Sequence, residues 1–132
     1  MKEFFPHSAT TDAITVRVAV SYLPEQSEPA KSRWFWAYHI RIENGGTRAV
    51  QLVSREWTIA DGRGASHVVQ GDGVVGEQPV IEPGGSFDYV SGCPLTTPTG
   101  TMEGHYNMVA ADGSRFAIEI PRFPLVAPTV SS

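Results

Sequence analysis

The fold is decided by residues 71–108, which read GDGVVGEQPVIEPGGSFDYVSGCPLTTPTGTMEGHYNM. This stretch holds a glycine triad, a Pro-Gly-Gly turn and the only cysteine of the chain. Pro83 and Gly84 fit the two central positions of a type II turn. The next segment, 87–90, predicts a strand that is apolar on one face. Two prolines between 91 and 100 predict a loop, because proline cannot donate a hydrogen bond to a neighbouring strand.

The clearest hairpin comes directly after this loop. Residues 102–110 alternate between apolar and polar side chains, an Asp-Gly pair makes the turn, and residues 116–120 return with the same alternation. Three prolines within 121–128 predict the end of regular structure. We expect the apolar residues 123–126 to dock on the body of the protein, while 128–132 frays.

Upstream, two segments show the two-residue period of half-buried strands. Residues 14–22 alternate strictly, and residues 34–43 place their larger apolar side chains at even positions, which predicts an even-numbered core face. Phe35 then points away from that face, where it either packs beneath a loop or belongs to an interface. Between the two strands, 23–31 has two prolines and no period, and predicts an exposed loop.

The middle of the chain predicts a second hairpin. Residues 44–46, Asn-Gly-Gly, suit a tight turn with positive φ angles, from which 48–60 is expected to pair back. Apolar residues move from even to odd positions within that strand. One extra residue near 54–55 would cause this change, so we expect a bulge or a crossing between sheets there. Residues 61–64 predict another turn, and 66–70 a short returning strand.

Together these segments predict an all-β fold. About seven antiparallel strands at this spacing favour an immunoglobulin-like or fibronectin type III-like β-sandwich. With 132 residues, the chain suits one domain, 1–132, with its core at about 10–125 and a flexible tail at 126–132. The single cysteine rules out the usual immunoglobulin disulfide within the chain, which favours the fibronectin-like variant.

Charge and cysteine content limit which kinds of partner and which cellular compartment we expect for the protein. Ten basic and fourteen acidic residues give a formal charge of -4 with no run of like charges, so we expect neither nucleic acid nor a membrane surface as a partner. One cysteine fits a reducing compartment. Glu3 and Pro6 interrupt the first apolar residues, which argues against a signal peptide. The expected location is the cytoplasm.

The glycine triad Gly71, Gly73 and Gly76 matches the pattern G-x-G-x-x-G of dinucleotide-binding loops. No helix can follow it, because two prolines and two glycines come within nine residues, so a Rossmann unit is excluded. Two interpretations stay open. The loop either offers successive N–H groups to a phosphate or pyrophosphate, or simply joins two strands. Asp72 would repel phosphate unless a cation compensates.

No metal site or catalytic constellation is recognisable. The histidines lack ligand spacing, and the acidic residues that might supply oxygen ligands for Mg²⁺ follow no known loop pattern. These candidates are His7, His39, His67, His105, Asp61, Asp72, Glu77 and Glu82. Cys93 would be a nucleophile only with a base such as His105 beside it, and otherwise serves packing. We therefore expect no cofactor and no enzymatic activity.

Aromatic residues are dense around Trp34-Phe35-Trp36, and most of them suit the core of a sandwich. A second interpretation concerns the surface. Phe35, Phe123 and Leu125 would form an exposed patch for a protein partner or for homodimerisation.

Four blocks of the sequence resemble the signature of the ApaG family. They are 50–57 (VQLVSREW), 71–79 (GDGVVGEQP), 91–95 (SGCPL) and 100–106 (GTMEGHY). The resemblance extends over roughly residues 10–125. It implies a fibronectin type III-like sandwich and a bacterial, cytoplasmic protein associated with cobalt resistance and magnesium efflux.

The same resemblance bears on partners. Similar domains occur in eukaryotic proteins that bind other proteins, among them an F-box protein and a polymerase-delta interacting protein. Family members often lie beside a diadenosine tetraphosphate hydrolase in the genome. The main hypothesis is therefore a non-enzymatic protein-interaction module in divalent-cation homeostasis. The alternative is an accessory protein that binds a nucleotide or pyrophosphate through Gly71, Gly73 and Gly76.

Overall fold

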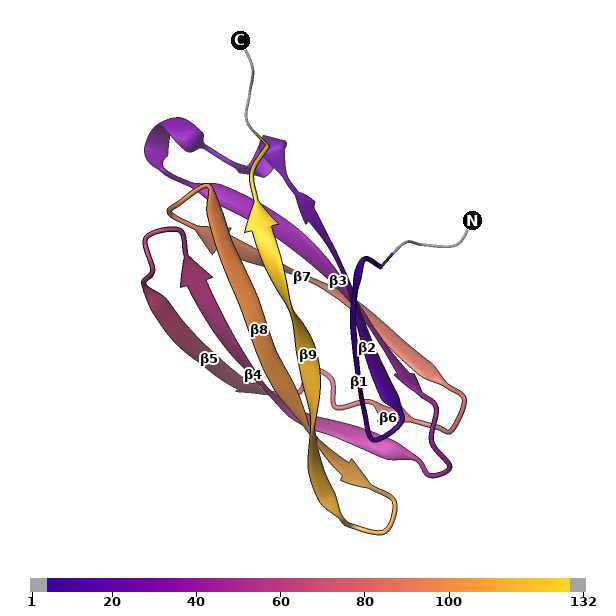
Figure 1. The fold of residues 1–132 in the computed structure, drawn as a ribbon. Helices are drawn as coiled ribbons and strands as arrows, with labels where there is room; N and C mark the ends of the chain where they lie inside the picture. The colour runs from indigo at the N-terminus through magenta and orange to yellow at the C-terminus, as the bar shows by residue number, and fades with distance from the viewer. Residues whose placement is uncertain (1–4, 129–132) are drawn as a thin grey trace.

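The computed structural model describes residues 5–128 and forms a sandwich of two antiparallel sheets (Figure 1). No helix among these residues is long and apolar enough to cross a membrane. The elements, in chain order, are β1 (His7–Thr11), β2 (Ile14–Tyr22), the 3-10 turns η1 (Pro24–Gln26) and η2 (Pro29–Lys31), β3 (Trp34–Asn44), β4 (Val50–Asp61), β5 (Ser66–Asp72), β6 (Val80–Ile81), β7 (Ser86–Leu95), β8 (Thr99–Ala110) and β9 (Arg115–Val126).

The first sheet has the strand order β1-β2-β3-β7, and the second has β5-β4-β8-β9 with β6 also paired to β4. One side of the sandwich is closed, because β9 packs beside β1 and β2 and the amide of Glu119 donates to Oγ1 of Thr11 at 3.2 Å. The other side lies between the edge strands β7 and β5. The predicted sandwich is confirmed, with nine strands among residues 5–128 in place of about seven, since β1 and β6 were not foreseen.

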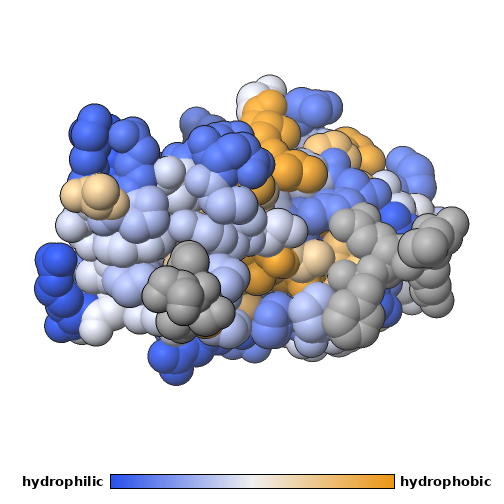
Figure 2. Space-filling view, turned by 90° about the horizontal axis from the view of Figure 1, so that it is seen from above, coloured by the Kyte–Doolittle hydropathy of each residue, from blue (hydrophilic) through white to orange (hydrophobic). Residues whose placement is uncertain are grey.

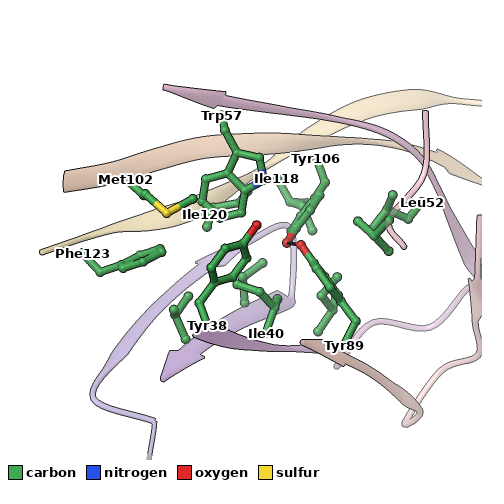
Figure 3. Packing of buried hydrophobic residues seen from close by; sticks show 14 of the residues in the cluster. Tyr38, Ile40, Leu52, Trp57, Tyr89, Met102, Tyr106, Ile118, Ile120 and Phe123 are labelled. Carbon is green, nitrogen blue, oxygen red and sulfur yellow. Dashed lines mark hydrogen bonds between the residues drawn. The ribbon is translucent and has the colours of Figure 1, made fainter. Parts of the chain in front are cut away.

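The core is built from the inward faces of both sheets, as the two-residue alternation predicts. Tyr38, Trp57 and Phe123 form an aromatic cluster at its centre (Figure 3), with ring centroids 5.3 to 6.2 Å apart. Beside this cluster the hydroxyl groups of Tyr89 and Tyr106 share a hydrogen bond of 2.5 Å. Burial raises the pKa of both tyrosines, so the pair stays neutral inside the apolar interior.

The predicted hairpin after Asn44 is wrong. β3 pairs with β2 and β7, whereas β4 belongs to the second sheet, so the Asn-Gly-Gly segment carries the chain from one sheet to the other. Neither Gly45 nor Gly46 has a positive φ. Instead, the side-chain Nδ2 of Asn44 donates to the carbonyl oxygens of Arg48 and Ile81, both at 2.9 Å, and so ties the crossing to two neighbouring segments.

Two local predictions are confirmed. The register of β4 against β8 shifts between Leu52 and Ser54, which is a bulge at the place where the apolar pattern changes phase. Gly84 has a φ of 79°, and the amide of Gly85 donates to the carbonyl of Glu82 at 2.8 Å, as a type II turn requires.

The loop predicted for 91–100 is mostly strand, because β7 continues through Pro94 to Leu95. β7 is an edge strand, and the residues that bond to β3 alternate along it. The backbone N–H of Asn44 donates to the carbonyl oxygen of Gly85, so odd-numbered residues of β7 direct their N–H and C=O groups toward β3. The nitrogen of Pro94 therefore points away from the sheet. A proline there costs no ladder hydrogen bond.

The predicted end of regular structure at Pro121 is also wrong. β9 runs on to Val126, and the register against β8 shifts between Met102 and Gly104, which accommodates Pro121 in a bulge. Phe123 and Leu125 are fully buried. Docking of this segment is therefore confirmed, whereas the fraying expected for 128–132 lies, beyond Pro128, outside the described residues.

Candidate functional site

The glycine triad does not form one continuous loop. Gly71 lies within β5, Gly73 is buried with a φ of 61°, and Gly76 lies at an exposed turn with a φ of 82°. Val75 also has a positive φ, so Val75 and Gly76 form the tip of a two-residue turn closed by mutual hydrogen bonds between Val74 and Glu77. The three glycines thus lie in three different backbone environments.

The N–H groups of this loop are largely committed to the protein itself. Gly73 donates to the carbonyl of Val53 at 2.8 Å, Val74 to Glu77 at 2.8 Å, and Glu77 back to Val74 at 2.9 Å. Within the turn, the amides of Val75 and Gly76 bond to none of the described residues. Any anion would therefore meet its donors at this exposed tip.

Arg55 is the cation that the sequence reasoning missed. Its Nη1 donates to the carbonyl oxygens of Asp72 at 3.1 Å and Gly73 at 2.6 Å. A Cβ atom on Gly71 would come within 2.8 Å of the same guanidinium, so that glycine makes room for it. The bulge in β4 turns Arg55 to the face that carries Trp57, and the phase change was the signal that could have revealed it.

The candidate metal ligands are not brought together. No group of three or more His, Cys, Asp or Glu side chains among residues 5–128 is placed to hold a metal ion. His39 contacts Asp88 on the outer face of the first sheet at 3.2 Å. His105 lies 3.8 Å from Glu56 on the second sheet.

The structure also separates Cys93 from His105. Cys93 lies on β7 in the first sheet with its side chain buried in the core, whereas His105 lies on β8 in the second sheet and points outward, opposite in phase to buried Tyr106. Burial raises the pKa of the Cys93 thiol to about 11. A thiol that stays protonated near neutral pH is a poor nucleophile, which fits the packing interpretation.

The exposed aromatic patch predicted from three residues is wrong in two of them, since Phe123 and Leu125 are core residues. Phe35 remains near the surface. Its ring lies across β7, where a Cβ atom on Gly92 would come within 2.6 Å of it. The remaining apolar surface therefore has to be sought around Phe35.

A cavity of about 490 Å³, here called the end groove, lies beside Phe35. It opens at the end of the sandwich where η1, the β4–β5 turn and the end of β7 meet (Figure 1). Trp34, Phe35, Pro94 and Leu95 form its apolar part. Figure 2 views the molecule from the end at which the groove opens. The remaining lining residues are Gln26, Arg33, Asp61, Ala65, Ser66, His67 and Thr96.

Known proteins resemble this chain in both sequence and fold. The family model of the ApaG domain matches residues 24–110. A protein named ApaG from Methylorubrum populi is 53% identical over 122 residues, which are 92% of this chain and 94% of that protein. Another, from Rhodospirillum centenum, is 50% identical with the same coverage.

A solved structure agrees with these sequence relatives. The crystal structure described as the putative ApaA protein from Bordetella pertussis superimposes with a TM-score of 0.85 at 45% identity, covering 89% of this chain and 95% of that one. Sequence and fold thus match over nearly the same residues. The chain belongs to the ApaG family.

Proposed function

We propose that this chain is a non-enzymatic, cytoplasmic protein-interaction module that acts in divalent-cation homeostasis through a protein partner. The observation that carries the proposal is the end groove. A volume of about 490 Å³ with Trp34, Phe35 and Leu95 along it suits the large apolar side chain of a partner. The link to cations comes from the family resemblance.

The rim of the end groove supports the same function. Arg33, Asp61 and His67 surround the apolar residues, so the groove has the apolar centre and polar border of a protein interface. Asp61 is held in place, because its carboxylate accepts hydrogen bonds from the amides of Arg63 and Ala65 at 2.8 and 3.1 Å. A preformed rim lowers the ordering cost of binding.

Filling the end groove is expected to abolish function without unfolding the protein. Ala65 is exposed and lines the groove, so Ala65→Trp occupies it while leaving the core unchanged. In a deletion strain challenged with Co²⁺, wild type restores tolerance and Ala65→Trp does not. Ala117→Trp, an equally large addition at an exposed position on β9, serves as the matched control and restores tolerance.

Two results would contradict this function. Full restoration of Co²⁺ tolerance by Ala65→Trp would show that the groove is not the working surface. A deletion strain with normal tolerance, together with pull-downs that recover no specific partner, would remove the interaction module altogether.

A second candidate function is binding of a nucleotide or pyrophosphate at the Gly71–Gly76 segment. The observation that favours it is the pair of unbonded amides of Val75 and Gly76 at the exposed tip. Two successive N–H groups in such a turn form a small nest for an anionic oxygen. Gly73 would act by shaping the turn, since it is buried and its own amide is bonded to Val53.

Substitution of Val75 tests this second function. Asp and Asn tolerate positive φ better than Val, and only Asp adds a negative charge next to the two amides. In an NMR titration with pyrophosphate or diadenosine tetraphosphate, wild type and Val75→Asn are expected to show saturable amide shifts at the tip. Val75→Asp should lose at least tenfold in affinity. Absence of saturable shifts in wild type would reject the function.

A further inference from the structure

The four edges of the two sheets differ in how they are protected. β1 and β9 lie against one another on the closed side of the sandwich. β7 carries Pro94 with its nitrogen facing outward. β5, with the sequence SHVVQGD, has no proline and no bulge, and its only acidic or basic side chain besides His67 is that of Asp72 at its end. Unprotected edges of this kind pair with other strands.

The pattern of hydrogen bonds shows which groups of β5 are available. The amide of Asp61 donates to the carbonyl of Ala65 and that of Gly73 to Val53, both at 2.8 Å. Odd-numbered residues of β5 therefore bond to β4, because bonding alternates along an antiparallel strand. The even-numbered residues point their N–H and C=O groups away from the sheet. They are Ser66, Val68, Gln70 and Asp72, of which the Asp72 carbonyl oxygen also accepts a hydrogen bond from Nη1 of Arg55.

The side chains of β5 are exposed on both faces. Val68 is 57% exposed. Val69 is 37% exposed although it is paired with buried Trp57 and lies on the same face of the sheet. The sandwich is thus open beside β5, and two adjacent valines there contact water.

We propose that β5 pairs antiparallel with β5 of a second copy of this chain, across a two-fold axis at Val69. This register engages all four outward-facing residues. Ser66 lies opposite Asp72 of the second copy, and Val68 lies opposite Gln70. The two sheets then join into one continuous sheet, and the interface is isologous.

Self-pairing suits this strand because its side chains are complementary to one another. Val69 meets Val69 of the second copy at the axis, which covers apolar surface on both. The carboxylate of Asp72 lies opposite the hydroxyl of Ser66, a donor, and no like charges face each other. The proposal goes beyond the interaction module, since it concerns a different partner and is tested by the oligomeric state.

Engineered cysteines test the register. Val69 would form a non-hydrogen-bonded pair with its counterpart, with Cα atoms about 4.5 Å apart, a distance that a disulfide can bridge. Val69→Cys is therefore expected to form a covalent dimer on mild oxidation. Val68→Cys is the matched control, because residue 68 lies opposite residue 70 of the second copy, so this variant is expected to form no disulfide-linked dimer. The native Cys93 is buried and gives little background.

Sedimentation equilibrium tests the dimer without any cross-link. Gln70→Pro removes an outward N–H group and leaves the backbone hydrogen bonds to β4 intact, so it is expected to sediment as a 14.3 kDa monomer, while wild type reaches twice that mass. Gln70→Ala loses the same side-chain hydrogen bond to Glu56 as Gln70→Pro but keeps the N–H group, so it also reaches twice that mass. Circular dichroism confirms that all three fold. A monomeric wild type at the highest accessible concentration, or equal cross-linking of the two cysteine variants, overturns the proposal.

Discussion

Phe123→Ala is expected to lower the free energy of unfolding by about 3–5 kcal/mol, the usual cost of removing a fully buried phenylalanine. The Phe123 ring is completely buried, with its centroid 6.2 Å from Tyr38 and 6.0 Å from Trp57. Its loss leaves a cavity between two aromatic rings that are anchored in different sheets. Urea denaturation followed by tryptophan fluorescence measures the change.

Val126→Ala provides the control for this prediction. Val126 lies three residues further along β9 and is 55% exposed, so its truncation should change stability by no more than about 0.5 kcal/mol. Equal, small effects of the two substitutions would mean that the last strand contributes little to the core.

Gly104→Ala is expected to destabilise the protein by about 3 kcal/mol, at the upper end of the range for an overpacked interior. A Cβ atom at Gly104 would overlap the carbonyl oxygen of Glu56 and lie 3.1 Å from Cα of Trp57. Both atoms belong to the backbone of β4, so the clash is relieved only if β8 moves away from its central partner. Thermal unfolding by circular dichroism measures the loss.

The neighbouring residue on the same strand serves as the reference. Glu103 is exposed, and Glu103→Ala should shift stability by less than about 0.5 kcal/mol. If Gly104→Ala behaved like Glu103→Ala, β4 and β8 would have room to separate, and the close approach at Gly104 would have no energetic role.

Local patterns predicted those parts of the fold that depend on neighbours in sequence. The alternation in β2 and β3, the turn at Gly84 and the bulge before Ser54 are all encoded within a few residues. Asn44 illustrates the opposite case. The same Asn-Gly-Gly chemistry serves a hairpin or a crossing between sheets, and the choice rests on the distant Ile81.

Prolines were misread for a related reason. Pro94 and Pro121 interrupt strands only where their nitrogen would face a partner, and sequence alone does not reveal which strand forms an edge or where a bulge lies. The residues of the candidate site also differ in whether the sequence alone reveals them. Arg55 was recoverable from the phase change in β4, whereas the end groove joins Trp34, Ala65 and Leu95 from three separate segments.

The closed side of the sandwich has a consequence for how the protein is made. Thr11 and Glu119, which are bonded there, are 108 residues apart in sequence. A ribosome releases the chain from its N-terminus at about 5–20 residues per second. The apolar face of β2 therefore stays uncovered until the final strand emerges, and during that interval newly made chains expose an apolar surface that favours aggregation.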